Sequence, residues 1–162
     1  MKNFRCSVLT SALLFGLCAS AFSATPTAAI NATATVTATA TATEAPVKVV
    51  YHLSEGSAQA SRALNNIRNH IEADPSVKIV VVALSGGVDF LLDGAQDAQG
   101  RAFAGPIAEL SNRGVKFLVC NNTLTVRGIA KEKVALEASL VPAGVAEVAR
   151  LQFREGFAYL RP

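Results

Sequence analysis

The chain has 162 residues, 51% of them hydrophobic, and a formal net charge of +3 at pH 7. That length fits one folded domain. From residue 47 onward the charge falls to about +2, with no basic stripe and no interleaved aromatics, so no nucleic-acid partner is expected.

The chain begins with a pattern typical of a secretory signal. Lys2 and Arg5 give a positive start, an apolar run extends over residues 8–21, and Ala19-Ser20-Ala21 has the small-x-small spacing that signal peptidase recognises. The run is short for a membrane span. We predict a signal peptide over residues 1–23, a periplasmic or secreted mature protein, and no membrane attachment after cleavage. An uncleaved anchor is the alternative.

A Thr/Ala-rich tract follows the apolar run. Residues 24–46 include an alternating Ala-Thr stretch and offer no large side chain to bury. Such a segment cannot offset the entropy of ordering. We therefore predict a disordered linker over residues 24–46 and a folded domain over residues 47–162.

The first half of the domain alternates strand and helix patterns. Residues 47–53 and 77–84 are nearly continuous apolar runs, as expected of strands covered on both faces. Between them a helix is predicted, ending near residues 74–75, with one apolar face at Ala60, Leu64, Ile67 and Ile71. Residues 85–87 break the second strand, and residues 88–96 show no clear period.

The second half repeats the alternation. A helix is expected over residues 98–112, kinked at Pro106 or restarting at Gly105. The later elements are predicted as a strand (115–120), a short helix (123–129), a strand (139–141), a helix from residue 142 with a face made of Val145, Val148, Ala149 and Gln152, and a last strand (157–160). This order predicts an α/β sandwich with a largely parallel sheet.

The strand at residues 115–120 ends on Cys120, the single cysteine left once the signal is removed. Chemistry in open parallel sheets lies at the carboxyl ends of strands. Asn121, Asn122 and Thr123 are helix-capping types whose amides are expected near the sulfur. A helix start favours thiolate over thiol, and can lower a cysteine pKa of about 8.5 by a unit or more. The other interpretation is a small buried hydrophobe that finishes a strand.

Three further residues are candidates at the same edge of the sheet. His52 could serve as a base or a proton donor to sulfur, or be a structural histidine. Ser85 follows the second strand, but neither a G-x-G-x-x-G nor a P-loop motif is present. Arg127 lies after Cys120 and could hold an anion or simply face solvent. One cysteine and two scattered histidines form no ligand cluster, so we expect no metal and no cofactor.

Four segments together resemble a known family. They are Ala63-Leu64-Asn65-Asn66-Ile67-Arg68-Asn69, the Cys120 segment over residues 114–124, Val141-Pro142-Ala143-Gly144-Val145, and the C-terminal residues 156–162. Jointly they are similar to the DsrE/DsrF-like family, relatives of the sulfur-relay proteins of the DsrEFH and TusBCD complexes. The resemblance implies a three-layer α/β/α sandwich with a five-stranded parallel sheet. It also implies assembly into homo- or hetero-oligomers, often trimers or hexamers, and a persulfide carried on Cys120. For this chain we predict a homo-oligomer, a trimer or a hexamer.

These observations lead to three functional hypotheses. The first is an exported sulfur carrier that takes sulfane sulfur from a donor on Cys120 and yields it to an acceptor thiol or protein. Asn121, Asn122 and Thr123 would supply hydrogen bonds in that carrier. The second is a non-catalytic oligomeric module that binds a small ligand, with Cys120 structural. The third is a redox sensor in which Cys120 forms a disulfide between chains.

Overall fold

The computed structural model describes residues 45–162. The predicted signal peptide, and nearly all of the predicted linker, lie outside these described residues. The strands are β1 (Lys48–Leu53), β2 (Lys78–Ala83), β3 (Lys116–Cys120), β4 (Ala138–Val141) and β5 (Ala158–Leu160). The helices are α1 (Ser57–Ala73), α2 (Ala104–Asn112), α3 (Asn121–Arg127) and α4 (Gly144–Glu155), with short 3-10 helices η1 (Ser85–Leu91) and η2 (Lys131–Lys133).

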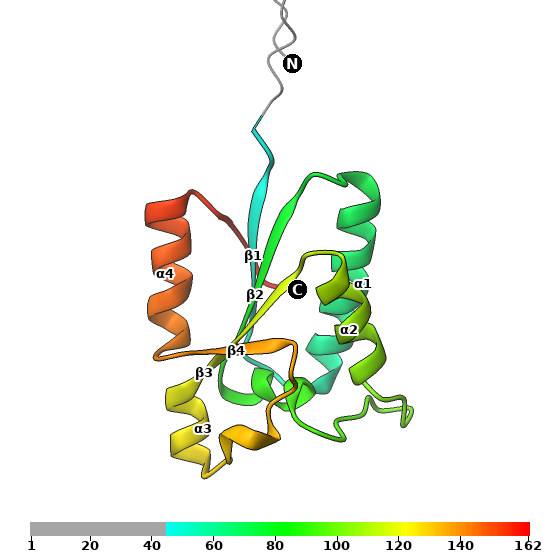
Figure 1. Cartoon of the computed structure of the whole chain (residues 1–162), viewed down its shortest axis with the longest axis vertical. Helices are drawn as coiled ribbons and strands as arrows, with labels where there is room; N and C mark the ends of the chain where they lie inside the picture. The colour runs from blue at the N-terminus through cyan, green and yellow to red at the C-terminus, as the bar shows by residue number, and fades with distance from the viewer. Residues whose placement is uncertain (1–44) are drawn as a thin grey trace, which may run out of the picture. The chain divides into compact units, whose positions relative to one another are not determined.

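The five strands form one sheet in the order β4-β3-β2-β1-β5, and every neighbouring pair is parallel. Helices α1 and α2 lie on one face of the sheet and α4 on the other (Figure 1). The predicted α/β sandwich with a parallel five-stranded sheet is confirmed. All five strands end at the same edge, and α3 follows β3 there.

After an exposed lysine at its first position, each central strand is largely apolar and buried, as expected of a strand covered on both faces. The larger core joins β1, β2 and β3 to α1, α2 and η1, with Ile67, Ile107 and Phe117 almost fully buried. The smaller core lies under α4 and contains Val50, Val80, Val82, Val148, Leu151 and Phe157. The predicted apolar face of α1 is buried as expected.

The second predicted helix begins later than the sequence indicated. Helix α2 starts at Ala104, so Pro106 lies in its first turn, where the missing N–H has no intrahelical acceptor to lose. Residues 93–103 instead form a loop with an isolated bridge between Gln96 and Ala102. The unassigned residues after β2 contain η1.

The predicted face of α4 is wrong. The residues of α4 buried against the sheet are Gly144, Val148 and Leu151, whereas Val145 is 66% exposed. The prediction placed Val145 on the buried face because its side chain is apolar. The buried position is Gly144, which has no side chain to contribute to a hydrophobic pattern but lies against the end of β3. Its absent Cβ would meet Cys120 Cβ at 3.2 Å and Leu84 Cδ2 at 2.9 Å.

Candidate functional site

Cys120 lies at the junction between a strand and a helix. It is the last residue of β3 and the N-cap residue of α3, which begins at Asn121 rather than at the predicted Thr123. Its side chain is 6% exposed. Because β3 runs directly into α3, Asn121, Asn122 and Thr123 form the first turn of the helix instead of capping it, and no side chain caps α3.

Backbone N–H groups from two helices converge on the Cys120 sulfur. Burial raises the pKa of the thiol, but it is outweighed by hydrogen bonds from the Thr123 hydroxyl and from the backbone N–H groups of Gly144, Thr123 and Asn122. The pKa of Cys120 is therefore lowered from its usual value. Hydrogen bonds to the anion favour the thiolate even where burial opposes it.

Helix η1, which follows β2 and begins at Ser85, contacts α3 through two hydrogen bonds and an ion pair. The Ser85 N–H donates to Thr123 Oγ1 at 3.0 Å, and Arg127 Nη1 donates to the Ser85 carbonyl oxygen at 3.0 Å. Arg127 also forms an ion pair with Asp89 of η1 at 2.7 Å. Ser85 has a φ of 52°, a left-handed conformation that costs a non-glycine residue free energy. These contacts hold Ser85 in that conformation and orient Thr123.

A hollow of about 450 Å³ opens at this edge of the sheet. Its lining residues are Ser85, Gly86, Asn122, Thr123, Val126 and Arg127. Thr123 thus lines the hollow and also hydrogen-bonds the sulfur. Val126 is 86% exposed and gives the hollow an apolar wall. Of the predicted site residues, the structure brings Ser85, Asn122, Thr123 and Arg127 together next to Cys120.

Comparison with known proteins assigns the chain to a family. The model of the DsrE/DsrF-like family matches residues 23–162. The chain belongs to the DsrE/DsrF-like family. Membership of this family suggests a role of the sulfur-relay type. No curated protein matches the chain.

Two solved structures share the fold of this DsrE/DsrF-like domain. The protein of unknown function MTH1491 from Methanobacterium thermoautotrophicum is 33% identical, with a TM-score of 0.65, over 72% of this chain and 99% of that one. The ychN protein from E. coli is 16% identical, with a TM-score of 0.58, over 72% of this chain and 98% of that one. The second likeness supports the fold alone.

His52 of the DsrE/DsrF-like domain lies apart from Cys120. It belongs to β1, its register partner on β2 is Val82, and Val82 in turn aligns with Leu118 of β3. Two strand spacings of about 4.8 Å therefore separate His52 from β3. Its Nδ1 is 2.7 Å from the Tyr159 hydroxyl, and its buried Nε2 has no partner within residues 45–162. The structure gives His52 a contact with β5 and does not bring it to the sulfur.

Gly144 is the site residue that sequence reasoning missed. Cys120 pairs with Val141 in the register of β3 and β4, so the segments after these two residues leave the sheet side by side. The Asn122 N–H accordingly donates to the Pro142 carbonyl oxygen at 3.2 Å. Gly144 opens α4 immediately afterwards, and its N–H reaches the sulfur. The order of the strands, which the pattern alone does not provide, was the missing signal.

The remaining predicted residue, Asn121, points its side-chain oxygen into the structure. Asn121 Oδ1 is buried without a hydrogen-bond partner among the described residues, while its backbone oxygen accepts from the Thr125 hydroxyl at 3.0 Å.

Within residues 45–162, no helix has both the length and the apolar character needed to cross a bilayer.

Proposed function

We propose that this protein is an exported sulfur carrier that holds sulfane sulfur as a persulfide on Cys120. The observation that supports this most is the convergence of N–H groups from α3 and α4 on one sulfur atom. A thiolate is the form of cysteine that attacks a sulfur donor. In the resulting persulfide the charge lies on the outer sulfur, so these donors stabilise the two thiolate states of Cys120, the one that attacks the donor and the one that is released on transfer.

The transfer step balances without an added oxidant. The Cys120 thiolate attacks a sulfane sulfur of a polysulfide, a Cys–S–S bond forms, and the donor S–S bond breaks. The electron pair of that bond leaves with the shortened polysulfide anion. An acceptor thiolate later attacks the outer sulfur and returns Cys120 to the thiolate.

A sulfur donor must reach a Cys120 sulfur that is largely buried. Cys120 is 6% exposed, and the hollow of about 450 Å³ is lined by its neighbours Asn122 and Thr123. A donor entering the hollow would reach the sulfur by displacing the Thr123 side chain. The contact between Ser85 and Thr123 is the hydrogen bond that such a movement would break.

The burial of Cys120 also favours a second candidate, a non-catalytic module that binds a small ligand in the hollow and uses Cys120 for packing. The two candidates differ in the rate at which a small disulfide reagent titrates Cys120. A carrier reacts in the folded state. A packed cysteine reacts only after addition of denaturant.

Export and assembly belong to the same proposal. The pattern of residues 1–23 supports a periplasmic or secreted location. The outer surface of α4 carries two exposed apolar side chains, Val145 at 66% and Phe153 at 93%, which supports a contact with another copy in a homo-oligomer. A trimer or a hexamer is the assembly that the family resemblance implies. Signal cleavage is measured by mass analysis of the protein recovered from the periplasm or medium, and assembly by light scattering.

Intact-mass analysis tests the carrier itself. The full chain carrying Cys6→Ser and Cys18→Ser has Cys120 as its one thiol. After incubation with polysulfide, it is expected to gain about 32 Da, one sulfur atom, reversed by a thiol reductant. The matched Cys120→Ser chain is expected to gain nothing. Equal gain in both chains, or no gain under conditions that persulfidate free cysteine, would contradict the proposal.

A further inference from the structure

Three lysines form a row at the edge of the sheet opposite Cys120. Lys48, Lys78 and Lys116 are the first residues of β1, β2 and β3. Lys48 pairs with Lys78 in the strand register, and Lys116 pairs with Val80. Side chains alternate along a strand, and Val50, Val80 and Leu118 belong to the core under α4. The three ammonium groups therefore project on the face that α4 covers.

This row is only partly compensated by the protein itself. Lys48 Nζ donates to the Glu155 carbonyl oxygen at 3.1 Å, at the end of α4. The two nearby carboxylates, of Glu147 and Glu155, are both bound by Arg150. The side-chain ammonium groups of Lys78 and Lys116 have no hydrogen-bond or ion-pair partner within residues 45–162. Lys48 Nζ also lies 5.9 Å from the centroid of the Phe157 ring. Like charges directly opposite one another on neighbouring strands repel, and of the three lysines only Lys48 has a compensating contact in the part of the chain that the structure describes.

The lysines surround a hollow with an apolar floor. Its volume is about 370 Å³, and its apolar lining comes from Val80, Leu118, Leu151 and Phe157. Four basic and two acidic side chains line it, an excess of two positive charges. A concave site of this size, apolar with a few charged groups at its rim, is typical of small-molecule binding.

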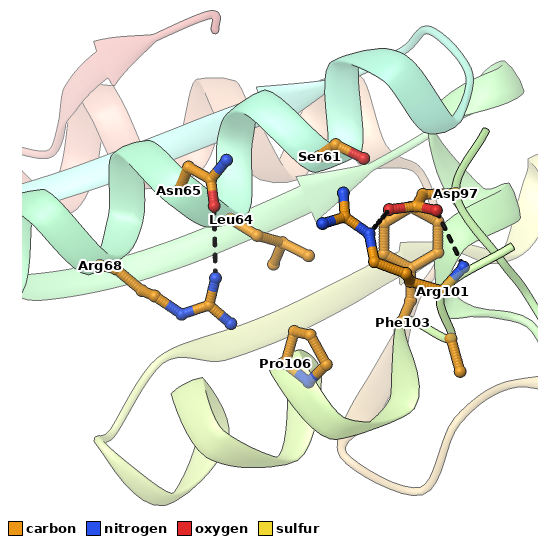
Figure 2. Close-up of a pocket in the computed structure, with 9 residues that line it drawn as sticks. Ser61, Leu64, Asn65, Arg68, Asp97, Arg101, Phe103 and Pro106 are labelled. Atoms are coloured by element: carbon orange, nitrogen blue, oxygen red, sulfur yellow. Dashed lines mark hydrogen bonds and ion pairs between the residues drawn. The ribbon is translucent and has the colours of Figure 1, made fainter. Parts of the chain in front are cut away.

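A second hollow, between α1 and α2, shows the contrasting case. Figure 2 shows Arg68 and Arg101 at that hollow, which has a volume of about 180 Å³. Arg68 is paired with Glu109 at 2.9 Å, and Arg101 with Asp97 at 2.6 Å. Both guanidinium groups are neutralised from within the fold, so that hollow has no unpaired cation to offer. The lysine hollow differs in this respect.

We propose that the lysine hollow binds a small organic monoanion with an apolar body. The anionic head would lie between the Nζ atoms of Lys78 and Lys116, and the body would cover Val80, Leu118 and Phe157. Binding would remove the repulsion between the lysines and bury apolar surface at once. An inorganic anion would contact the lysines but not the apolar floor of the hollow. A neutral apolar molecule would cover the floor but leave the lysines without a counter-charge. The site therefore selects a ligand that carries both features.

NMR titration of the full-length protein tests the proposal with naphthalene-2-carboxylate as the probe. Saturable shifts are expected at the backbone amides of Lys78, Val80, Lys116 and Leu118. Sulfate has the charge without the apolar body, and naphthalene-2-carboxamide has the body without the charge. Each is expected to bind at least about tenfold more weakly than the carboxylate. Absence of saturable shifts at these amides, or sulfate binding as tightly, would overturn the proposal.

Charge-reversal variants identify the groups responsible. Lys78→Glu and Lys116→Glu are at exposed positions and are each expected to weaken naphthalene-2-carboxylate binding about tenfold or more. Lys131→Glu changes the net charge equally, but lies in η2, outside the lining of the hollow. If Lys131→Glu weakens probe binding equally, the effect comes from the net charge of the protein, and the proposed site is wrong. If the two variants change the oligomeric state and leave probe binding intact, the lysines contact another copy and the ligand proposal fails.

Discussion

The backbone N–H of Ser85 donates a hydrogen bond to Thr123 Oγ1 at 3.0 Å. A hydroxyl has one proton to donate and accepts through its lone pairs. Acceptance from Ser85 therefore leaves the Thr123 proton for the Cys120 sulfur, whose pKa this hydrogen bond lowers. The loop after β2 thereby influences a cysteine on β3 without contacting its sulfur.

Thr123→Val is expected to raise the pKa of Cys120, because valine has a similar shape but no proton to donate. The rate of alkylation by iodoacetamide, followed against pH, measures this pKa through the thiolate fraction. Thr123→Ser keeps the hydroxyl and should leave the pH profile close to that of the parent chain. A profile for Thr123→Val that matches the parent would show that the hydroxyl does not act on the sulfur.

Gly144→Ala is expected to slow the reaction of Cys120 and raise its pKa. The added Cβ would meet Cys120 Cβ at 3.2 Å and Leu84 Cδ2 at 2.9 Å, so the cysteine must move away from the Gly144 N–H. Ala149→Gly is the matched control, since it weakens α4 by about 1 kcal/mol at an exposed position. Alkylation profiles should distinguish them. If Ala149→Gly shifts the profile as much, the effect comes from helix stability.

Gly87→Ala is expected to destabilise the protein strongly, whereas Gly86→Ala is tolerated. A Cβ at Gly87 would lie 2.2 Å from the Leu53 carbonyl oxygen and 2.7 Å from the Ser54 nitrogen, both backbone atoms. Overpacking typically costs about 1–3 kcal/mol, and contact with backbone atoms that cannot move aside puts Gly87→Ala at the upper end of that range. At Gly86 the nearest atoms lie at 3.5 Å, an ordinary contact, so the change should stay within about 1 kcal/mol. Urea unfolding compares the two, and equal stabilities would contradict the steric argument.

The layered fold was predictable from the sequence because its signals are local. Continuous β-branched runs mark β1, β2 and β3, and the spacing of Ala60, Leu64, Ile67 and Ile71 marks the buried face of α1. The position of Cys120 at the end of a strand followed from the same runs. Each of these inferences needed only a few neighbouring residues.

The site needed information that local patterns do not carry. Contact between the Cys120 sulfur and Gly144 depends on β4 lying beside β3. The hydrogen bond from Ser85 to Thr123 joins residues far apart in the chain, and the conformation of Ser85 has no signature in its side chain. His52 was expected at the edge of the sheet as a possible partner of sulfur. Its placement against Tyr159 became visible only once β5 was known to pair with β1.

His52 is expected to make the protein sensitive to acid. Burial, and to a lesser degree the charge of Arg161, lowers the pKa of His52 from its usual value of 6.5. The unfolded chain then binds this proton more readily, so stability is complete above a pH of about 6.5 and falls as the pH drops through the folded pKa. Chemical unfolding should show a larger loss between neutral and acidic pH in the parent chain than in His52→Asn. An identical pH dependence in the two chains would contradict this assignment.

Gln59→Leu is expected to destabilise the protein, because Gln59 is a buried polar residue, 1% exposed, that joins three segments. Its Oε1 accepts from the Ser54 and Glu55 N–H groups at 2.9 and 2.8 Å, and its Nε2 donates to the Pro162 carbonyl oxygen at 3.2 Å. Leucine fills the space but leaves the two N–H groups without their acceptor, at about 1–3 kcal/mol each. Asn66→Leu makes a comparable change at an exposed position of α1 and should alter stability by no more than about 0.5 kcal/mol. Because Ser54 and Glu55 join β1 to α1, hydrogen exchange should accelerate at these two amides in Gln59→Leu and remain unchanged in Asn66→Leu.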